Sequence, residues 1–262
     1  MMDNLLILIL IISIFNIFLF SQNDLISNKI NLFDYPDSNR KIHLKKIAIT
    51  GGIFIFVNLI FLFIILKINF FQFSNLIFLN KRELVSFLLL ISSLFVIGLY
   101  DDKYDLNPFK KIFLYTFFIL ICLLIDENLI IRELNFYSVN YSIKLFNLAI
   151  PFTLLSILLF LNALNMFDGI DLQVSIYSLF LFIYFIFKLD ISFLILIIPV
   201  LLFVIYFNYK KKLFLGDSGS NILATLISFI VIKEYNNGYE KIYCEEIFLL
   251  MLIPGIDMLS YL

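Results

Sequence analysis

Stretches of roughly 20 residues without a charged side chain recur along this chain, and that is the length a helix needs to cross the hydrocarbon core of a bilayer. Of the 262 residues, 62% are hydrophobic, compared with roughly 45–50% in soluble globular domains. The sequence therefore predicts an all-α fold, a polytopic integral membrane helical bundle.

Nine candidate spans can be placed, at roughly residues 4–21, 47–66, 84–100, 109–125, 147–162, 172–187, 190–207, 219–233 and 246–262. No Pro/Gly-rich linker and no block of like charges divides them, so residues 1–262 are expected to form a single domain. The first segment is expected to be a retained span. It lacks the positively charged start and the small-residue cleavage site of a signal peptide.

The charge balance and the cysteines exclude some classes of function. The net charge is −1, so the chain offers no overall electrostatic attraction to nucleic acid, and no nucleic-acid partner is expected. Cys122 and Cys244 lie far apart and lack the spacing of metal ligands. They are expected to be small apolar fillers.

Four short polar segments interrupt the hydrophobic runs, at residues 34–43, 101–102, 162–171 and 216–220. If successive spans alternate in direction, all four fall on the side that is reached after the first span, and so does Asp257. That side also carries more than half of the nineteen Lys and Arg residues, which indicates the cytoplasm. Carboxylates from distant parts of the chain are therefore expected to meet at one membrane surface.

The second polar segment pairs Asp101 with Asp102 at the end of a predicted span. Adjacent carboxylates raise each other's pKa unless a cation neutralises them. Mg²⁺ suits such a position, because it takes carboxylate oxygens and shares its coordination with substrate phosphates. Lys110 and Lys111 add phosphate-binding potential. The alternatives are an Asp-Asp turn that caps a helix and two ordinary interfacial lysines.

The third polar segment spaces Asn162, Asn165, Asp168 and Asp171 three residues apart. On a helix, this spacing places successive side chains near one face, so the four can converge. The alternative is a polar segment that only ends a helix.

The fourth polar segment, Gly216–Ser220, opens a predicted span. Backbone N–H groups at a helix start form a natural phosphate cradle, and Asp217 can ligate a metal there. Phe214, three residues earlier, is placed to stack on a nucleobase. The alternatives are a helix N-cap and one interfacial Phe among the 33 of this chain.

The first polar segment carries Asp34, Asp37, Arg40, Lys41 and His43, the one histidine of the chain. Its Arg and Lys can bind phosphate, although a lone loop histidine is more often simply solvated. On the opposite side of the membrane, residues 135–145 alternate in character and predict a small hairpin.

In their order and spacing, these motifs resemble those of the polyprenyl-phosphate N-acetylhexosamine-1-phosphate transferase family. The resemblance extends from Asp34 to Asp257 and is most specific in segments 162–171 and 214–220. Arg40, Lys41 and His43 are more similar to the GlcNAc-type branch than to the phospho-MurNAc-pentapeptide translocases. The resemblance implies ten or eleven spans in a complete family member.

The resemblance also implies a reaction, in which an N-acetylhexosamine 1-phosphate passes from a UDP-sugar to undecaprenyl phosphate and UMP is released. This step starts a cell-envelope glycan of the O-antigen or teichoic acid type. The resemblance implies Mg²⁺, or Mn²⁺ in its place, and a bilayer partner; it leaves the oligomeric state open, with a homodimer as one option. It places the enzyme in the bacterial inner membrane with its active site on the cytoplasmic face. Both a one-step and a two-step mechanism stay open.

The family's roles carry over to matching positions. Asp217 is expected to be the metal ligand, and the catalytic residues are expected to be Asp101, Asp102, Asp168 and Asp171. The substrate-binding residues are expected to be Asn162, Asn165, Phe214, Lys110, Arg40, Lys41 and His43.

Three features depart from the family pattern. Leu172 stands where the family usually has Gly, and Thr50 precedes Gly51 where it usually has Pro. The family's later His- and Arg-rich cytoplasmic loop and last spans have no counterpart before Leu262, which leaves two expectations open: a fragment, or a family member with impaired activity. The alternatives are a phospho-MurNAc-pentapeptide transferase, a cation-coupled transporter and an inactive lipid-binding fragment.

Overall fold

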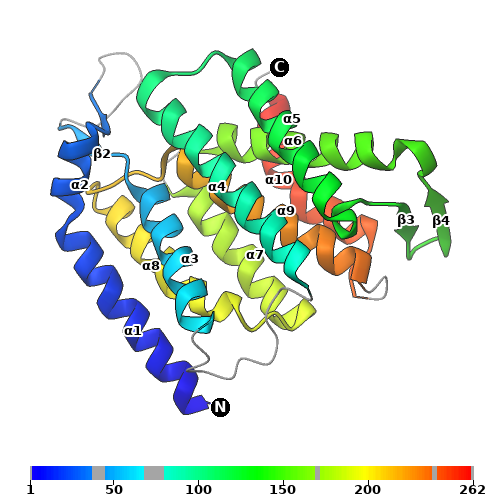
Figure 1. Ribbon diagram of the computed structural model, residues 1–262, viewed down its shortest axis with the longest axis horizontal. Helices are drawn as coiled ribbons and strands as arrows, with labels where there is room; N and C mark the ends of the chain where they lie inside the picture. The colour runs from blue at the N-terminus through cyan, green and yellow to red at the C-terminus, as the bar shows by residue number, and fades with distance from the viewer. Residues whose placement is uncertain (1, 37–44, 68–79, 169–171, 238–240, 261–262) are drawn as a thin grey trace.

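Helices dominate the computed structural model, as the hydrophobic runs predict (Figure 1). The structure describes residues 2–36, 45–67, 80–168, 172–237 and 241–260. Within these ranges the α-helices are α1 (Met2–Ser21), α2 (Asn23–Ile30), α3 (Gly51–Lys67), α4 (Lys81–Tyr104), α5 (Pro108–Ile125), α6 (Ala149–Phe167), α7 (Gln173–Leu189), α8 (Leu194–Tyr209), α9 (Gly216–Asn237) and α10 (Cys244–Ser260). The short 3₁₀ helices are η1 (Glu127–Leu129) and η2 (Phe146–Leu148). Each predicted span has its helix, and α2 is an additional one.

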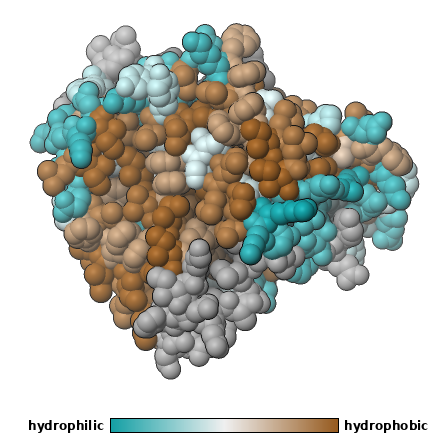
Figure 2. Space-filling model, in the orientation of Figure 1, coloured by the Kyte–Doolittle hydropathy of each residue, from teal (hydrophilic) through white to brown (hydrophobic). Residues whose placement is uncertain are grey.

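The lengths of these helices confirm a polytopic membrane protein. Among the described residues, three helices are long and apolar enough to span a bilayer: α4, α5 and the helical segment Phe146–Phe167. If α1 and α2, which meet at a bend of 51°, are counted as one broken span, they form a fourth. Shorter apolar helices lie at Gly51–Ile65, Gln173–Leu189 and Leu194–Tyr209. In Figure 2 the exposed surface over the helices is mostly hydrophobic, and hydrophilic side chains gather along its edges. The full count of nine spans stays a prediction.

Two small antiparallel ribbons complete the fold. One pairs β1 (Phe33–Asp34) with β2 (Ile47–Ala48), and the other pairs β3 (Glu133–Phe136) with β4 (Tyr141–Lys144). The second ribbon is the hairpin predicted from the alternation in residues 135–145. These short ribbons connect helices and leave the helical bundle as the main architecture.

Helix α9 lies at the centre of the bundle, where it packs against α3, α4 and α6, and almost all of its residues between Ser218 and Tyr235 are buried. Gly98 of α4 allows the closest approach. A Cβ atom at this position would lie 2.6 Å from the Cα of Ser218 and 2.6 Å from the Nδ2 of Asn221. The missing side chain therefore lets α4 and α9 meet one turn before the Asp pair that ends α4.

Buried amides and one buried ion pair join helices away from that contact. Asn16 of α1 and Asn58 of α3 exchange two hydrogen bonds, of 3.1 and 3.0 Å. At the opposite end of the α4–α9 pair, the ammonium of Lys233 lies 2.8 Å from a carboxylate oxygen of Glu83. Both side chains are almost fully buried. Such paired polar groups fix the register of helices that lipid alone would not hold together.

Leu172 precedes α7 with a backbone φ of +74°. This left-handed conformation costs an L-residue with a Cβ atom roughly 1–2 kcal/mol and costs glycine little. The chain therefore keeps a glycine-type turn at a position where the family it resembles has glycine.

We expect Leu172→Gly to be more stable than Leu172→Ala by about 1 kcal/mol, because both lose the leucine contacts but only alanine keeps the left-handed strain. At an ordinary position the order would be reversed. Thermal unfolding of both variants in the same detergent measures the difference. Equal or greater stability of the alanine variant would contradict the strained turn.

Candidate active site

The polar segments that lie far apart in the sequence meet at one end of the bundle. The end of α4 brings Asp101 and Asp102, the first turn of α5 brings Lys111, the end of α6 brings Asn165, and the start of α9 brings Asp217. The predicted convergence is therefore confirmed for these described members.

A lysine connects the two carboxylates that point into this cluster. The Nζ atom of Lys111 lies 2.5 Å from Oδ2 of Asp101 and 2.5 Å from Oδ2 of Asp217. The side chain of Lys111 is only 13% exposed, and those of Asp101 and Asp217 are 10% and 28% exposed. One ammonium thus bridges two acids from different helices, at a place that remains partly open to solvent.

Further hydrogen bonds orient both carboxylates. The Nδ2 group of Asn165 donates to Oδ2 of Asp217 over 3.1 Å, and the backbone N–H of Leu106 donates to Oδ1 of Asp101 over 2.6 Å. Hydrogen bonds to a carboxylate favour its charged form. Asp101 and Asp217 are therefore held in fixed orientations that face the same cation.

Asp102 has a different position from its neighbour Asp101. Its two carboxylate oxygens accept the backbone N–H groups of Asp217, at 2.7 Å, and of Ser218, at 3.0 Å. Gly216 makes this contact possible, because its φ is +72° and a Cβ atom there would lie 2.8 and 2.9 Å from the two Asp102 oxygens. An Asp on α4 thus caps the start of α9.

This cap corrects one expectation from the sequence. The N–H groups at the start of α9 were expected to be open as a phosphate cradle, but those of Asp217 and Ser218 already donate to Asp102. The carboxyl oxygens of Asp102 also lie at the positive end of the helix dipole. A phosphate at this end of the bundle must therefore rely on side-chain cations such as Lys111.

A second hydrogen-bonded layer lies directly behind the cluster. The hydroxyl of Tyr115 donates to Oδ1 of Asn221 over 3.0 Å, and Nδ2 of Asn221 donates to the carbonyl of Leu94 over 3.3 Å. Tyr115 lies four residues after Lys111, and Asn221 four residues after Asp217. One helical turn separates the layers, so the pair fixes α5 against α9 beneath the ion pairs. The sequence reasoning missed both residues, although their i,i+4 spacing was visible.

The segment before α9 is attached to the end of the first polar loop. The N–H of Phe214 donates to the carbonyl of Ala48 over 2.8 Å, and the carbonyl of Phe214 accepts the N–H of Gly51 over 2.9 Å. Gly52 N–H donates to the carbonyl of Leu215 over 3.1 Å. The ring of Phe214 is half-buried, and its stacking on a nucleobase stays a prediction.

Other predicted site residues lie near the cluster or outside the described chain. Asn162 is half-buried on α6, and Asp168 caps the C-terminus of the same helix. Lys110 is exposed, and the structure brings Lys111 into the cluster in its place. The remaining predicted residues, Arg40, Lys41, His43 and Asp171, lie outside the described residues.

The cluster fits a magnesium ion that is shared with a substrate. Within the described ranges, no three His, Cys, Asp or Glu side chains are grouped so that they could hold a metal ion. Mg²⁺ needs no such set, because it usually binds through one or two carboxylates together with waters and substrate phosphates. Asp101 and Asp217 provide two oxygen ligands that already converge on one cation.

Comparisons with known proteins identify a family whose matched region contains the cluster. Residues 84–234, which include the whole cluster, match the model of "Glycosyl transferase family 4". The chain is 27% identical, over 89% of its length, to a Bacillus subtilis protein named "Probable undecaprenyl-phosphate N-acetylglucosaminyl 1-phosphate transferase". It is 25% identical, over 93% of its length, to a Yersinia pestis "Undecaprenyl-phosphate alpha-N-acetylglucosaminyl 1-phosphate transferase". The matched regions cover 63% and 68% of these two relatives.

Proposed function

The chain belongs to glycosyl transferase family 4, and from this premise we propose that it transfers an N-acetylhexosamine 1-phosphate from a UDP-sugar to undecaprenyl phosphate. The products are UMP and an undecaprenyl-diphosphate-linked sugar, with which a cell-envelope glycan begins. The names of the two relatives support undecaprenyl phosphate as the acceptor and N-acetylglucosamine as the sugar.

The observation that carries this proposal is the cluster of Asp101, Lys111 and Asp217 at the ends of three helices. Anionic and cationic side chains meet there at one end of a membrane bundle. The phosphate of a polyprenyl lipid lies at the membrane surface, where a soluble sugar nucleotide can reach it. A cation-coupled transporter would instead place such groups near the bilayer midplane.

In the proposed reaction, an oxygen of the lipid phosphate attacks the β-phosphorus of the sugar nucleotide. A new P–O bond joins the lipid to the sugar phosphate, the bond from the β-phosphorus to the bridging oxygen breaks, and UMP leaves with that oxygen. Phosphoryl transfer depends mainly on positioning and charge neutralisation. Lys111 supplies a cation that can turn towards a phosphate oxygen. Asp101 is placed to hold or accept a proton of the lipid phosphate.

We also propose Mg²⁺, or Mn²⁺ in its place, as the cofactor, held by Asp217. When bound, the ion supplies charge neutralisation for the diphosphate and for the departing UMP. Asn165 orients the carboxylate of Asp217, and Asp102 fixes its backbone. Asp102 thus acts on the reaction by positioning α9, in addition to any contact with the lipid phosphate.

The remaining predicted roles complete the site. Phe214 stacks on uracil, Asp168 with Asp171 and Asn162 organises the nucleotide, and the basic residues of the first loop with Lys110 contact phosphate. The proposed location is the bacterial inner membrane, with the cluster on the cytoplasmic face.

A membrane assay tests the proposed function. Membranes that contain the chain are incubated with radiolabelled UDP-GlcNAc and undecaprenyl phosphate, with Mg²⁺ or with excess chelator. We expect label in the lipid and stoichiometric UMP with Mg²⁺ only, because the diphosphate needs its charge neutralised. Parallel arms with UDP-GalNAc and UDP-MurNAc-pentapeptide define the sugar. Labelling that persists in chelator would exclude the metal, and release of UDP in place of UMP would exclude this reaction.

A further inference from the structure

The β3–β4 hairpin lies at the end of the bundle opposite the carboxylate cluster. Helix α5 begins beside the cluster and ends at Ile125, the hairpin follows, and α6 then returns from Ala149 to Asn165 in the cluster. In Figure 1 the two strands project at one edge of the molecule, next to the start of α6. The proposed reaction leaves this part of the chain without a role.

The hairpin has one apolar face and one polar face. In its register Leu134 lies opposite Ile143, and Phe136 opposite Tyr141. Residues paired across an antiparallel ribbon point to the same side, and neighbours along a strand alternate. The other face therefore carries the alternating polar residues Glu133, Asn135, Ser142 and Lys144.

The hairpin is held firmly against α9 and α10. The hydroxyl of Tyr235 accepts the N–H of Asn135 over 2.7 Å and donates to the carbonyl of Glu133 over 2.8 Å. The carboxylate of Glu245, at the start of α10, accepts the N–H of Ser138 over 3.0 Å and its hydroxyl over 2.8 Å. These contacts fix the orientation of the apolar face.

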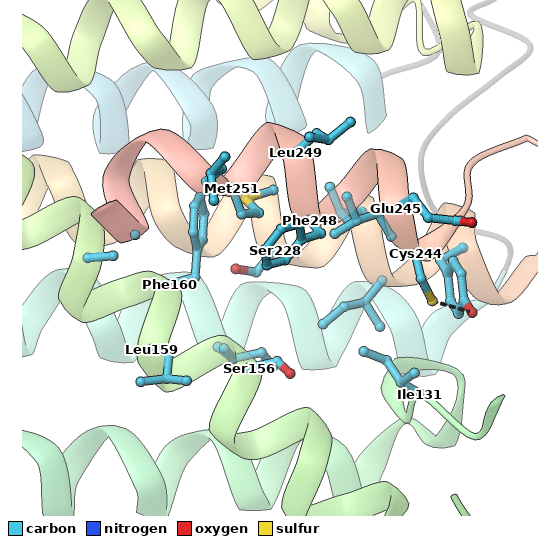
Figure 3. Close-up of a pocket in the computed structure, with 18 of the residues that line it drawn as sticks. Ile131, Ser156, Leu159, Phe160, Ser228, Cys244, Glu245, Phe248, Leu249 and Met251 are labelled. Carbon is cyan, nitrogen blue, oxygen red and sulfur yellow. Dashed lines mark hydrogen bonds between the residues drawn. The ribbon is translucent and has the colours of Figure 1, made fainter. Parts of the chain in front are cut away.

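The apolar face continues a cavity that borders the lipid-facing helices. A cavity of about 890 Å³ lies between α6, α9 and α10, and Leu134 and Phe136 form part of its wall. Figure 3 shows Leu159, Phe248 and Leu249 among its lining side chains. Leu159 and Phe248 are also largely exposed on the surface of their helices. The hairpin thus extends an apolar surface that belongs to helices of a membrane bundle.

Beyond the cavity, the same segment exposes large apolar side chains. Tyr141 is 63% exposed and Phe146 79% exposed, and Tyr137, Val139 and Leu148 are exposed as well. Aromatic side chains with a polar tip are enriched where membrane and water meet. Lys144, on the polar face, is also exposed and can stay in water or reach lipid phosphate.

We propose that this hairpin is an interfacial anchor that lies flat on the bilayer surface opposite the active site. Its apolar face, with Tyr141 and Ile143, rests on the first carbons of the lipid chains, and its polar face, with Ser142 and Lys144, faces water. The occupant of the surface is the phospholipid interface. The apolar face is continuous with the apolar side chains of α6 and α10, and β4 places Tyr141 and Ile143 on the face opposite Ser142 and Lys144.

The absence of tryptophan from the chain gives a direct test. The full chain with Tyr141→Trp, Ile143→Trp or Ser142→Trp is reconstituted into phosphatidylcholine vesicles, with and without lipids brominated near the carbonyl end of the chains. We expect Tyr141→Trp and Ile143→Trp to lose about half of their emission to bromine, since interfacial aromatic rings sit at this depth. The matched control Ser142→Trp, on the opposite face, should lose little.

Every other pattern overturns the proposal. Equal quenching at all three positions would mean that both faces of the hairpin lie within the hydrocarbon core of the bilayer. No quenching would place it in water. Tyr141→Trp emission that ignores bromine but changes with the protein-to-lipid ratio would identify a second copy of the chain as the occupant. Thermal unfolding of each variant shows whether the substitution disturbs the fold. Agreement between Ile143→Trp and Tyr141→Trp excludes local misfolding at one position as the cause of the quenching.

Discussion

Asp217→Asn is expected to lower the rate of sugar-phosphate transfer on the order of a thousandfold, the several kcal/mol that metal-assisted charge stabilisation contributes to a transition state. The substitution keeps the size of the side chain. It removes one of the two negative charges that converge on Lys111. The rate is measured in the membrane assay at saturating Mg²⁺ and again over a Mg²⁺ titration, in which the variant should need more metal.

Asp105→Asn is the matched control for this variant. Asp105 is exposed on the same side of the bundle, four residues after Asp101, and its φ of +47° is one that Asn adopts readily. It should keep normal activity. If Asp217→Asn were as active as this control, with an unchanged Mg²⁺ requirement, Asp217 would not be the metal ligand.

Lys111→Met is expected to cause the second large effect. Removing the ammonium leaves Asp101 and Asp217 as neighbouring, largely buried carboxyl groups without a cation. Loss of one partner from a buried pair costs roughly 3–5 kcal/mol, and the exposure of this cluster reduces that cost, so we expect a loss of about 2 kcal/mol in unfolding free energy. Activity should fall at least on the order of a hundredfold, because the phosphate also loses a cationic contact.

Lys110→Met separates this effect from a general loss of positive charge. Lys110 is the preceding residue of α5 and is exposed. Its replacement should leave the unfolding temperature unchanged and reduce activity much less. Excess Mg²⁺ should restore part of the stability of Lys111→Met, because a divalent cation can replace the ammonium between the two acids. Equal effects of the two lysine variants would contradict the geometry of the cluster.

These two lysines illustrate what the sequence could and could not predict. Adjacent residues on a helix differ in direction by about 100°, so the choice between Lys110 and Lys111 depends on how α5 is rotated against α4 and α9. The same holds for Asp101 and Asp102, of which one faces Lys111 and the other caps α9. The sequence predicted the acidic pair but could not show which of the two carboxyl groups contacts Lys111 and which one caps α9.

Features that follow from length and periodicity were predictable. The hydrophobic runs located the helices, and the alternation in residues 135–145 located the hairpin. Counting spans brought the polar segments to one end of the bundle. The partnership of Tyr115 with Asn221 depends on packing between α5 and α9 and has no local signature, except that each residue lies one turn beyond a cluster residue. The roles of Arg40, Lys41, His43 and Asp171 stay predictions.

The cap that Asp102 provides for α9 has a consequence for biogenesis. The first N–H groups of the helix that carries Asp217 donate their hydrogen bonds to a carboxylate more than a hundred residues earlier in the chain. A nascent polypeptide inserted only as far as α8 already contains the capping carboxylate of Asp102 but lacks α9 and the Asp217 that this cap holds in place. The cluster can therefore form only once α9 packs against α4, α5 and α6. Two separately expressed pieces, divided between α8 and α9, should be inert alone and regain turnover when they associate in one membrane.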